Sequence, residues 1–144
     1  MGVRRQGREW ALRALVLLDC NPELPVEEAV RRLAEMHAAD PRETWPVFSD
    51  EARLFGEDLV RGAWARRDAI DDIIRQHSVA WRLERMAVVD RNILRLALYE
   101  IVFLSVPKAI VIDEAVELAR RYGAEGSTAF VNGILDKVAG QGEA

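Results

Sequence analysis

The residues best suited to chemistry in this sequence are the arginines at its start. Residues 1–13 carry four arginines against one glutamate, in a protein whose formal net charge is −4. Arg4 and Arg8 are spaced i, i+4, with Arg5 beside them, so a helix would place them on one side. Guanidinium groups offer paired donors that suit phosphate. These N-terminal arginines therefore have two interpretations: a solvated helix face, which composition alone favours, and a phosphate-binding site.

Phe130 is the second candidate, because it follows Gly126-Ser127-Thr128 at an expected helix start. An aromatic ring in a first helical turn can remain accessible to a stacking base. The backbone amides of a helix N-terminus also attract phosphate. The alternative is that Phe130 belongs to the core, and the sequence favours neither interpretation.

Residues for enzymatic or metal chemistry are not found in a usable pattern. His37 and His77 are 40 residues apart and the protein has one cysteine, so no metal-ligand spacing appears. Adjacent carboxylates such as Asp71-Asp72 would point about 100° apart on a helix. We therefore expect no enzyme activity, no metal and no cofactor.

Cys20 and the N-terminus bear on the compartment. A single cysteine excludes an internal disulfide and fits a reducing cytoplasm. Because Cys20 ends an amphipathic segment, we expect a buried structural thiol. The N-terminal arginines are not followed by an uninterrupted apolar core, so we expect no secretory signal and a cytoplasmic protein.

The stretch Asp90–Leu104 organises the rest of the chain. It is apolar over most of a helical circumference, which is typical of a helix buried in a core. Its narrow polar stripe includes Arg95, for which we expect an exposed edge or a salt bridge to a neighbouring helix. Glu100 lies opposite the stripe, where an unpaired buried charge would be costly. We expect Glu100 to be buried and paired, with Arg8 or with amides at a helix start.

The other elements also read as helices, and no convincing strand is present. The sequence predicts helices over residues 4–20, about 26–39, from an N-cap at Ser49, over 110–122 and from Ser127 onward. It also predicts a proline-bracketed loop at 40–46, a break near 66–68 with Asp68 as the next cap, a turn over 78–82, and Gly123 as a C′ residue. The fold class is all-α, with about seven helices. Residues 1–144 form one domain, with halves of about 1–78 and 79–144.

Three motifs, in this order and spacing, resemble the NusB family of bacterial transcription antitermination factors over nearly the whole chain. RRQGREWALRALVLLD (residues 4–19) is similar to the family's arginine-rich opening. VDRNILRLALYEI (89–101) resembles its central-helix motif. IDEAVELARRYGAEGSTAFVNGILDKV (112–138) resembles its closing block.

The resemblance implies an all-α fold of two packed three-helix bundles around a central buried helix. It further implies binding of boxA-type nascent RNA together with NusE, a small-subunit ribosomal protein. Other Nus factors and RNA polymerase would join them to support processive transcription of ribosomal RNA operons. By position, the RNA-contacting residues would be Arg4, Arg5, Arg8, Ser127 and Phe130, with Val16 and Asp90 at a partner-binding surface or at the rim of the site.

Two departures from the family pattern affect the expected RNA affinity. Val16 stands where the first helix often has an aromatic residue, so one stacking contact is missing. Gly126 stands where an aspartate usually precedes the serine of the closing block. Losing that charge reduces repulsion of RNA, while glycine loosens the helix start.

Two alternatives to the RNA-binding interpretation remain open. One is a NusB-like protein-interaction or homodimerisation module with weak RNA affinity alone. The other is the RNA-binding appendage of an RNA methyltransferase, where this fold also occurs. We expect the second to be the poorer fit, because no catalytic domain is found within the 144 residues.

Overall fold

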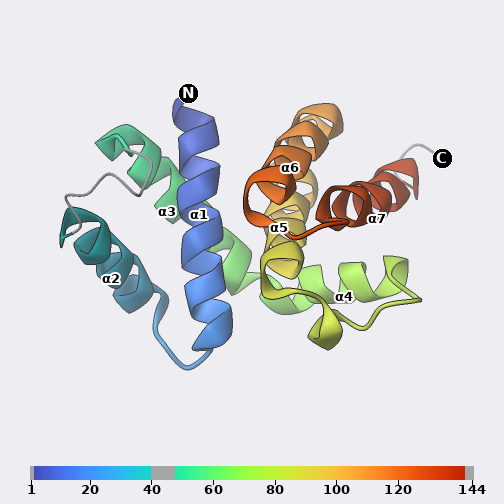
Figure 1. The fold of residues 1–144 in the computed structure, drawn as a ribbon, viewed down its shortest axis with the longest axis horizontal. Helices are drawn as coiled ribbons and strands as arrows, with labels where there is room; N and C mark the ends of the chain where they lie inside the picture. The colour runs from blue at the N-terminus through green and yellow to red at the C-terminus, as the bar shows by residue number, and fades with distance from the viewer. Residues whose placement is uncertain (1, 40–47, 142–144) are drawn as a thin grey trace. The chain divides into compact units, whose positions relative to one another are not determined.

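The computed structural model describes residues 2–39 and 48–141, and within them the secondary structure is helical (Figure 1). Seven α-helices and no strand occur in these ranges, which confirms the all-α prediction. The proline-bracketed loop predicted at 40–46 lies outside the described residues. The chain divides into two compact units, residues 1–64 (unit 1) and 65–144 (unit 2).

Unit 1 contains three helices: α1 (Val3–Cys20), α2 (Val26–Ala39) and α3 (Asp50–Ala65). Their bounds lie within a few residues of those predicted. At the start of α3 the backbone N–H of Ala52 donates to Ser49 Oγ at 3.1 Å, as expected for an N-cap serine. Asp50 and Glu51 follow in the first turn, where the helix dipole favours negative charge.

Helices α1 and α3 approach each other closely at Gly7 and Gly56. A Cβ atom on Gly56 would lie 2.5 Å from the carbonyl oxygen of Gly7, and one on Gly7 would lie 2.9 Å from the Ala52 carbonyl oxygen. Both distances are too short for a side chain, so glycine permits this crossing. Beside it, the fully buried Trp10 ring makes edge contacts with Phe48 at 5.2 Å and His37 at 6.0 Å.

Unit 2 contains α4 (Arg67–His77), a short 3₁₀ turn (Leu83–Arg85), α5 (Val88–Leu98), a π-helical turn (Tyr99–Phe103), α6 (Lys108–Tyr122) and α7 (Ser127–Gln141). Helix α5 contacts α4, α6 and α7, which confirms its predicted central position (Figure 1). The unit therefore has four α-helices, the central helix α5 and three others. Its boundary falls after Trp64 and not near residue 78, because α4 packs against α5 and α7.

A buried ion pair joins α4 to α5. The Arg95 guanidinium donates to both carboxylate oxygens of Asp71, at 2.8 and 3.0 Å, and also to Asn92 Oδ1 at 3.1 Å. A salt bridge to a neighbouring helix was one of the two alternatives expected for Arg95. The structure shows that salt bridge, and the Arg95 side chain is buried and not at an exposed edge. Asp71 is therefore paired with Arg95. Its neighbour Asp72 pairs with a different arginine, Arg75.

The central helix ends in a π-helical turn that the periodicity did not predict. The backbone N–H of Leu104 donates to the Tyr99 carbonyl at 3.2 Å, an i→i+5 bond. Ser105 follows with a positive φ of 54°, and Val106 N–H closes onto the Glu100 carbonyl at 3.0 Å. Here the prediction of burial is wrong for Val102, Phe103 and Leu104. With Ile110 at the start of α6 they form the exposed apolar group, four apolar residues that are 38–51% exposed.

Four further expectations can be compared with the structure. Cys20 is exposed and not buried, because it lies past Leu18, the last buried residue of α1. Arg66 occupies the N-cap of α4, so Asp68 lies inside the first turn and does not cap it. Glu100 is 2% exposed and has an interaction partner, so its predicted burial is confirmed, while the identity of that partner stays a prediction. Gly123 caps α6 with a φ of −85°, so it is not there for a left-handed conformation.

Candidate nucleic-acid interface

The predicted arginines on α1 differ in their accessibility. Arg4 is exposed and Arg5 is half-buried, so both can reach a solvent-borne phosphate. Arg8 is only 5% exposed and already has an interaction partner, as does Arg5. The helical spacing that places the three residues near one another is therefore observed, but Arg8 faces inward. Val16 lies further along α1 and is half-buried.

The turn between α6 and α7 positions Ser127 and Phe130. Ser127 is buried, and its Oγ accepts a hydrogen bond from the Ala124 N–H at 3.0 Å. A Cβ on Gly123 would lie 2.6 Å from both Ser127 Cβ and the Ala119 carbonyl oxygen, so glycine is needed for this close approach. The hydroxyl of Ser127 thus has a structural partner, and its side chain holds the turn.

Gly126 has a φ of +87°, and a Cβ there would meet no atom within 4 Å. Glycine therefore suits the backbone of this turn, because most side chains disfavour positive φ. The Phe130 N–H donates to the Gly126 carbonyl at 3.0 Å and completes the first turn of α7. The glycine that departs from the family pattern is consistent with a well-formed helix start.

Phe130 is half-buried at the wall of a hollow of about 270 Å³, which we call the Phe130 hollow. Both interpretations of Phe130 thus hold in part, because the ring packs on the protein and also borders open space. The hollow lies between α7 and the loop over residues 78–82. Gly133 helps to keep it open, since a Cβ there would meet nothing within 4 Å. The lining residues are His77, Ser78, Val79, Ala80, Trp81, Ala129, Phe130, Gly133, Ile134 and Lys137.

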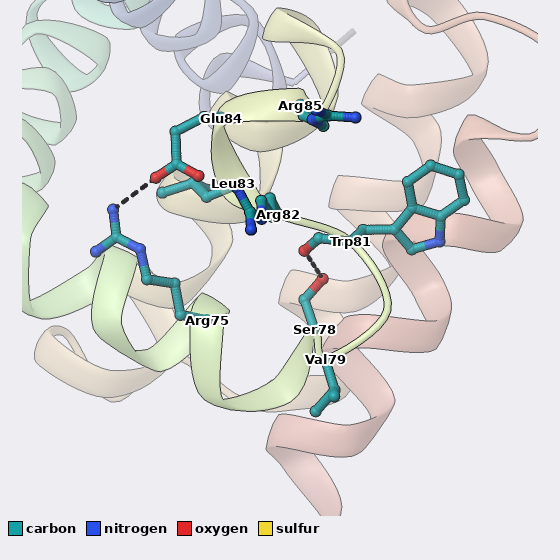
Figure 2. A pocket seen from close by; sticks show the side chains of 8 residues that line it. All are labelled: Arg75, Ser78, Val79, Trp81, Arg82, Leu83, Glu84 and Arg85. Atoms are coloured by element: carbon teal, nitrogen blue, oxygen red, sulfur yellow. Dashed lines mark hydrogen bonds and ion pairs between the residues drawn. The ribbon is translucent and has the colours of Figure 1, made fainter.

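The loop over residues 78–82 has a buried base and an exposed tip. Ser78 Oγ donates to the Trp81 carbonyl at 2.8 Å (Figure 2). His77 Nδ1 donates to the Ile73 carbonyl at 2.8 Å. Both His77 and Ser78 are buried, whereas Trp81 is 60% and Val79 93% exposed. Exposed apolar side chains on an anchored turn point to a contact surface.

A second hollow of about 710 Å³, the Arg75 hollow, shares Ser78, Val79 and Trp81 with the Phe130 hollow. Figure 2 shows Arg75 paired with Glu84, at 3.1 Å, and the Trp81 ring projecting away from this pair. The pKa of Glu84 lies below its ordinary value, chiefly through a hydrogen bond with its own backbone and then through Arg75. Of the charged groups that line the hollow, three are guanidinium groups and one is a carboxylate: Arg75, Arg82, Arg85 and Glu84.

Asp90 lies in the first turn of α5, where the helix dipole favours a carboxylate. It is 8% exposed, and within the described residues no hydrogen bond reaches its buried Oδ1 atom. Because this oxygen is itself buried, a binding partner reaches it only if neighbouring side chains move. The partner-binding or rim role that the resemblance implied stays a prediction.

The predicted site residues fall into two groups, one on α1 of unit 1 and the other on α5 and α7 of unit 2. Within unit 2, four residues that the sequence did not single out line the two hollows: Trp81, Arg82, Arg85 and Lys137. The sequence placed Trp81 only in the turn predicted over residues 78–82. Its place in a predicted turn, next to Arg82, was the signal that could have identified it.

The family of the chain follows from a direct match. The family model described as the NusB family matches residues 5–140. The described residues have the helical fold that the resemblance implied. The chain therefore belongs to the NusB family.

Individual relatives agree with this assignment. A curated relative, the transcription antitermination protein NusB of Anaeromyxobacter sp. (strain Fw109-5), is 46% identical over 139 residues, which cover 94% of this chain and 89% of the relative. The structure of NusB from T. maritima is 35% identical, with a TM-score of 0.79, and the match covers 94% of this chain and 89% of that one. As a member of this family the protein is a transcription antitermination factor and not an enzyme, as the sequence predicted.

A second similar structure contains the antitermination factors NusB and NusE in complex with double-stranded RNA. Its matching chain is 26% identical to this one, with a TM-score of 0.79, and the match covers 94% of this chain and 95% of that chain. Within residues 2–39 and 48–141 of the present protein, no group of His, Cys, Asp and Glu side chains could hold a metal ion. None of the helices in those ranges has the length and hydropathy of a membrane span.

Proposed function

We propose that this protein binds boxA-type single-stranded RNA together with NusE and thereby supports processive transcription of ribosomal RNA operons. The observation that carries the proposal is the similarity, over 94% of this chain, to a structure in which NusB and NusE are bound to double-stranded RNA. In this role the protein would act in the cytoplasm, with other Nus factors and RNA polymerase as further partners.

The RNA-contacting residues form one group in each unit: Arg4, Arg5 and Arg8 in unit 1, and Ser127 and Phe130 in unit 2. Arg4 and Arg5 are accessible enough to contact phosphates directly. Arg8 is buried, which suits a share in orienting α1. Ser127 shapes the turn before α7, and Phe130, at the wall of the Phe130 hollow, stacks against a base.

The NusE-binding surface includes Asp90, in the first turn of α5. Val16 lies at the rim of the site on α1. The exposed apolar group at the end of the central helix and the start of α6 supplies apolar area of the kind that protein interfaces bury. Charged side chains are depleted from the cores of such interfaces.

The experiment that tests the proposal measures the affinity for a boxA-type RNA with and without NusE. Binding should tighten when NusE is present. If Arg4 and Arg5 each neutralise one phosphate, replacing both with glutamine should flatten the slope of log K against log salt by about 1.4, since single strands give roughly 0.7 per contact. Replacing Arg8 as well would bring the change to about 2 if it also contacts a phosphate. A parent protein that binds neither RNA nor NusE would contradict the proposal.

The second candidate function is a homodimerisation or protein-interaction module with weak RNA affinity alone. The exposed apolar group is the observation that favours it. Light scattering at several concentrations distinguishes the two candidates. A dimer that Leu104→Glu dissociates, together with RNA affinity that NusE does not change, would support the second.

A further inference from the structure

We propose that Trp81 and its basic neighbours form an additional RNA-contacting surface of unit 2, on which a base stacks against Trp81 while Arg82, Arg85 and Lys137 contact the phosphates. We call these four residues the Trp81 surface. The inference rests on the proposed function, because it assumes that RNA is the ligand, and it extends the site beyond Phe130.

The first argument is the exposure of Trp81 on an anchored turn. A side chain of this size normally buries most of its surface. Here Trp81 remains 60% exposed, although Ser78, at the base of the same loop, is buried and its Oγ donates to the Trp81 carbonyl. The backbone is therefore fixed while the ring is displayed, and an ordered ring loses little entropy when a base stacks on it.

The second argument is continuity with Phe130. Trp81 and Phe130 line the same hollow of about 270 Å³, one from the loop and the other from α7. This volume is close to the lower end of small-ligand pockets, about 300 Å³. Two aromatic side chains at one small hollow form a platform on which successive bases of a single strand can stack.

The third argument is charge. Lys137 lines the Phe130 hollow, Arg82 and Arg85 line the Arg75 hollow, and Trp81 lines both. Arg75 Nη2 lies 3.1 Å from Glu84 Oε1, so the Arg75 charge offsets that of the one carboxylate at the Arg75 hollow (Figure 2). The exposed cations thus flank the aromatic ring within a protein of net charge −4.

This arrangement favours nucleic acid over a protein partner. Aromatic side chains interleaved with cations are the pattern of surfaces that bind single-stranded nucleic acid. Protein interfaces also enrich tryptophan and arginine but deplete lysine, so Lys137 is the member of the Trp81 surface that favours nucleic acid. The exposed apolar group has four large apolar side chains, with the Arg66 guanidinium 5.2 Å from the centre of the Phe103 ring.

The test uses the full chain with NusE and a boxA-type RNA extended by six uridines at each end. Trp81→Ala should weaken binding by about 5- to 150-fold with little change in salt slope, as expected for a lost stacked base. Trp81→Phe should retain most of the affinity, because it keeps an aromatic face. Leu54→Ala, at another exposed apolar residue, is the matched control and should bind as the parent does.

The phosphate contacts are tested separately. Replacing Arg82 and Arg85 with glutamine should flatten the salt slope by about 1.4. Replacing Arg31 and Arg32 with glutamine changes the net charge equally, at exposed positions of α2, and should leave the slope unchanged. Gly133→Leu, which fills the Phe130 hollow without a clash within 4 Å of its Cβ, should weaken RNA binding without unfolding the protein.

Two results would overturn the inference while leaving the proposed function intact. One is parent-like affinity of Trp81→Ala together with a parent-like salt slope of the double arginine variant. The other is a loss of NusE binding in Trp81→Ala when no RNA is present, which would make the surface a protein-binding one. A parent that fails to bind RNA even with NusE contradicts the proposed function itself, and this inference with it.

Discussion

In unit 1 the helices α1 and α3 approach so closely that glycine is required on both, whereas in unit 2 the central helix α5 is joined to α4 by a buried ion pair. A glycine contact sets how near two helices lie. An ion pair with two parallel hydrogen bonds also fixes their mutual register and orientation. Asp71 and Arg95 lie on the two helices that flank the loop over residues 78–82, so the pair bears directly on the position of Trp81.

The two units also differ in what they leave exposed. Among the described residues, the large exposed apolar side chains of unit 1 are Met36 and Leu54. Unit 2 exposes six, at the 78–82 loop, at the end of the central helix and at the start of α6: Val79, Trp81, Val102, Phe103, Leu104 and Ile110. Unit 2, whose helices are joined by the buried ion pair, is thus also the unit that exposes more large apolar side chains.

The largest expected effect comes from breaking the ion pair of unit 2. Asp71→Ala should lower the free energy of unfolding by about 3–5 kcal/mol, because it leaves the Arg95 charge buried without its carboxylate. Urea unfolding measures the change. Replacing both residues, Asp71→Leu with Arg95→Met, should cost much less, since no uncompensated charge remains. Equal destabilisation by the single and double variants would show that packing and not charge sets the cost.

The corresponding change in unit 1 is Gly56→Ala. Its Cβ would lie 2.5 Å from the Gly7 carbonyl oxygen, so α1 and α3 must move apart. Overpacking of this kind costs about 1–3 kcal/mol, and a thermal unfolding curve reports it. A variant as stable as the parent would mean that the two helices can separate without penalty.

A third substitution provides the control for the second. Gly133 is also a helical glycine, but a Cβ there meets nothing within 4 Å. Gly133→Ala should therefore raise the free energy of unfolding by about 0.5–1 kcal/mol, the usual gain from replacing glycine inside a helix. Measured under the same conditions, the opposite signs at positions 56 and 133 would attribute the cost at Gly56 to the close approach. Destabilisation at both positions would remove that distinction.

The smallest effect is expected at Ser105, which has a φ of 54° after the π-helical turn. A non-glycine residue in the left-handed region lowers the stability of the fold by about 1–2 kcal/mol. Glycine removes this strain, but its greater freedom in the unfolded chain lowers the stability by about 0.5–1 kcal/mol. Ser105→Gly should thus stabilise by roughly 0.5 kcal/mol. Ser105→Val, which is β-branched, should destabilise. Calorimetry of both variants checks the order.

The helices could be predicted because their signals are local. The Ser49 cap, the breaks near residues 66 and 78 and the apolar faces each depend on a few neighbouring residues. The π-helical turn could not be predicted, because its extra backbone residue leaves no mark in the apolar pattern of Asp90–Leu104. For the same reason, burial was predicted too far along this helix.

The site was only partly predictable from the sequence. A spacing of i, i+4 places Arg4 and Arg8 near one another but does not say which of them faces the core, and Arg8 does. Phe130 was predicted to be a site residue from its position in a first helical turn, and this role stays a prediction. Trp81 was missed because exposure depends on what packs against a residue from distant parts of the chain, and a tryptophan before an apolar helix is more often part of a core.

The π-helical turn at Tyr99–Phe103 has a consequence for how this chain can change in length. A turn closed by i→i+5 bonds contains one residue more than an α-helical turn closed by i→i+4 bonds. The chain can lose a residue here and revert to the α-helical path, with the register of Ile93–Leu98 before the turn unchanged. Insertion and deletion, as well as substitution, can thus alter which apolar side chains the end of the central helix presents.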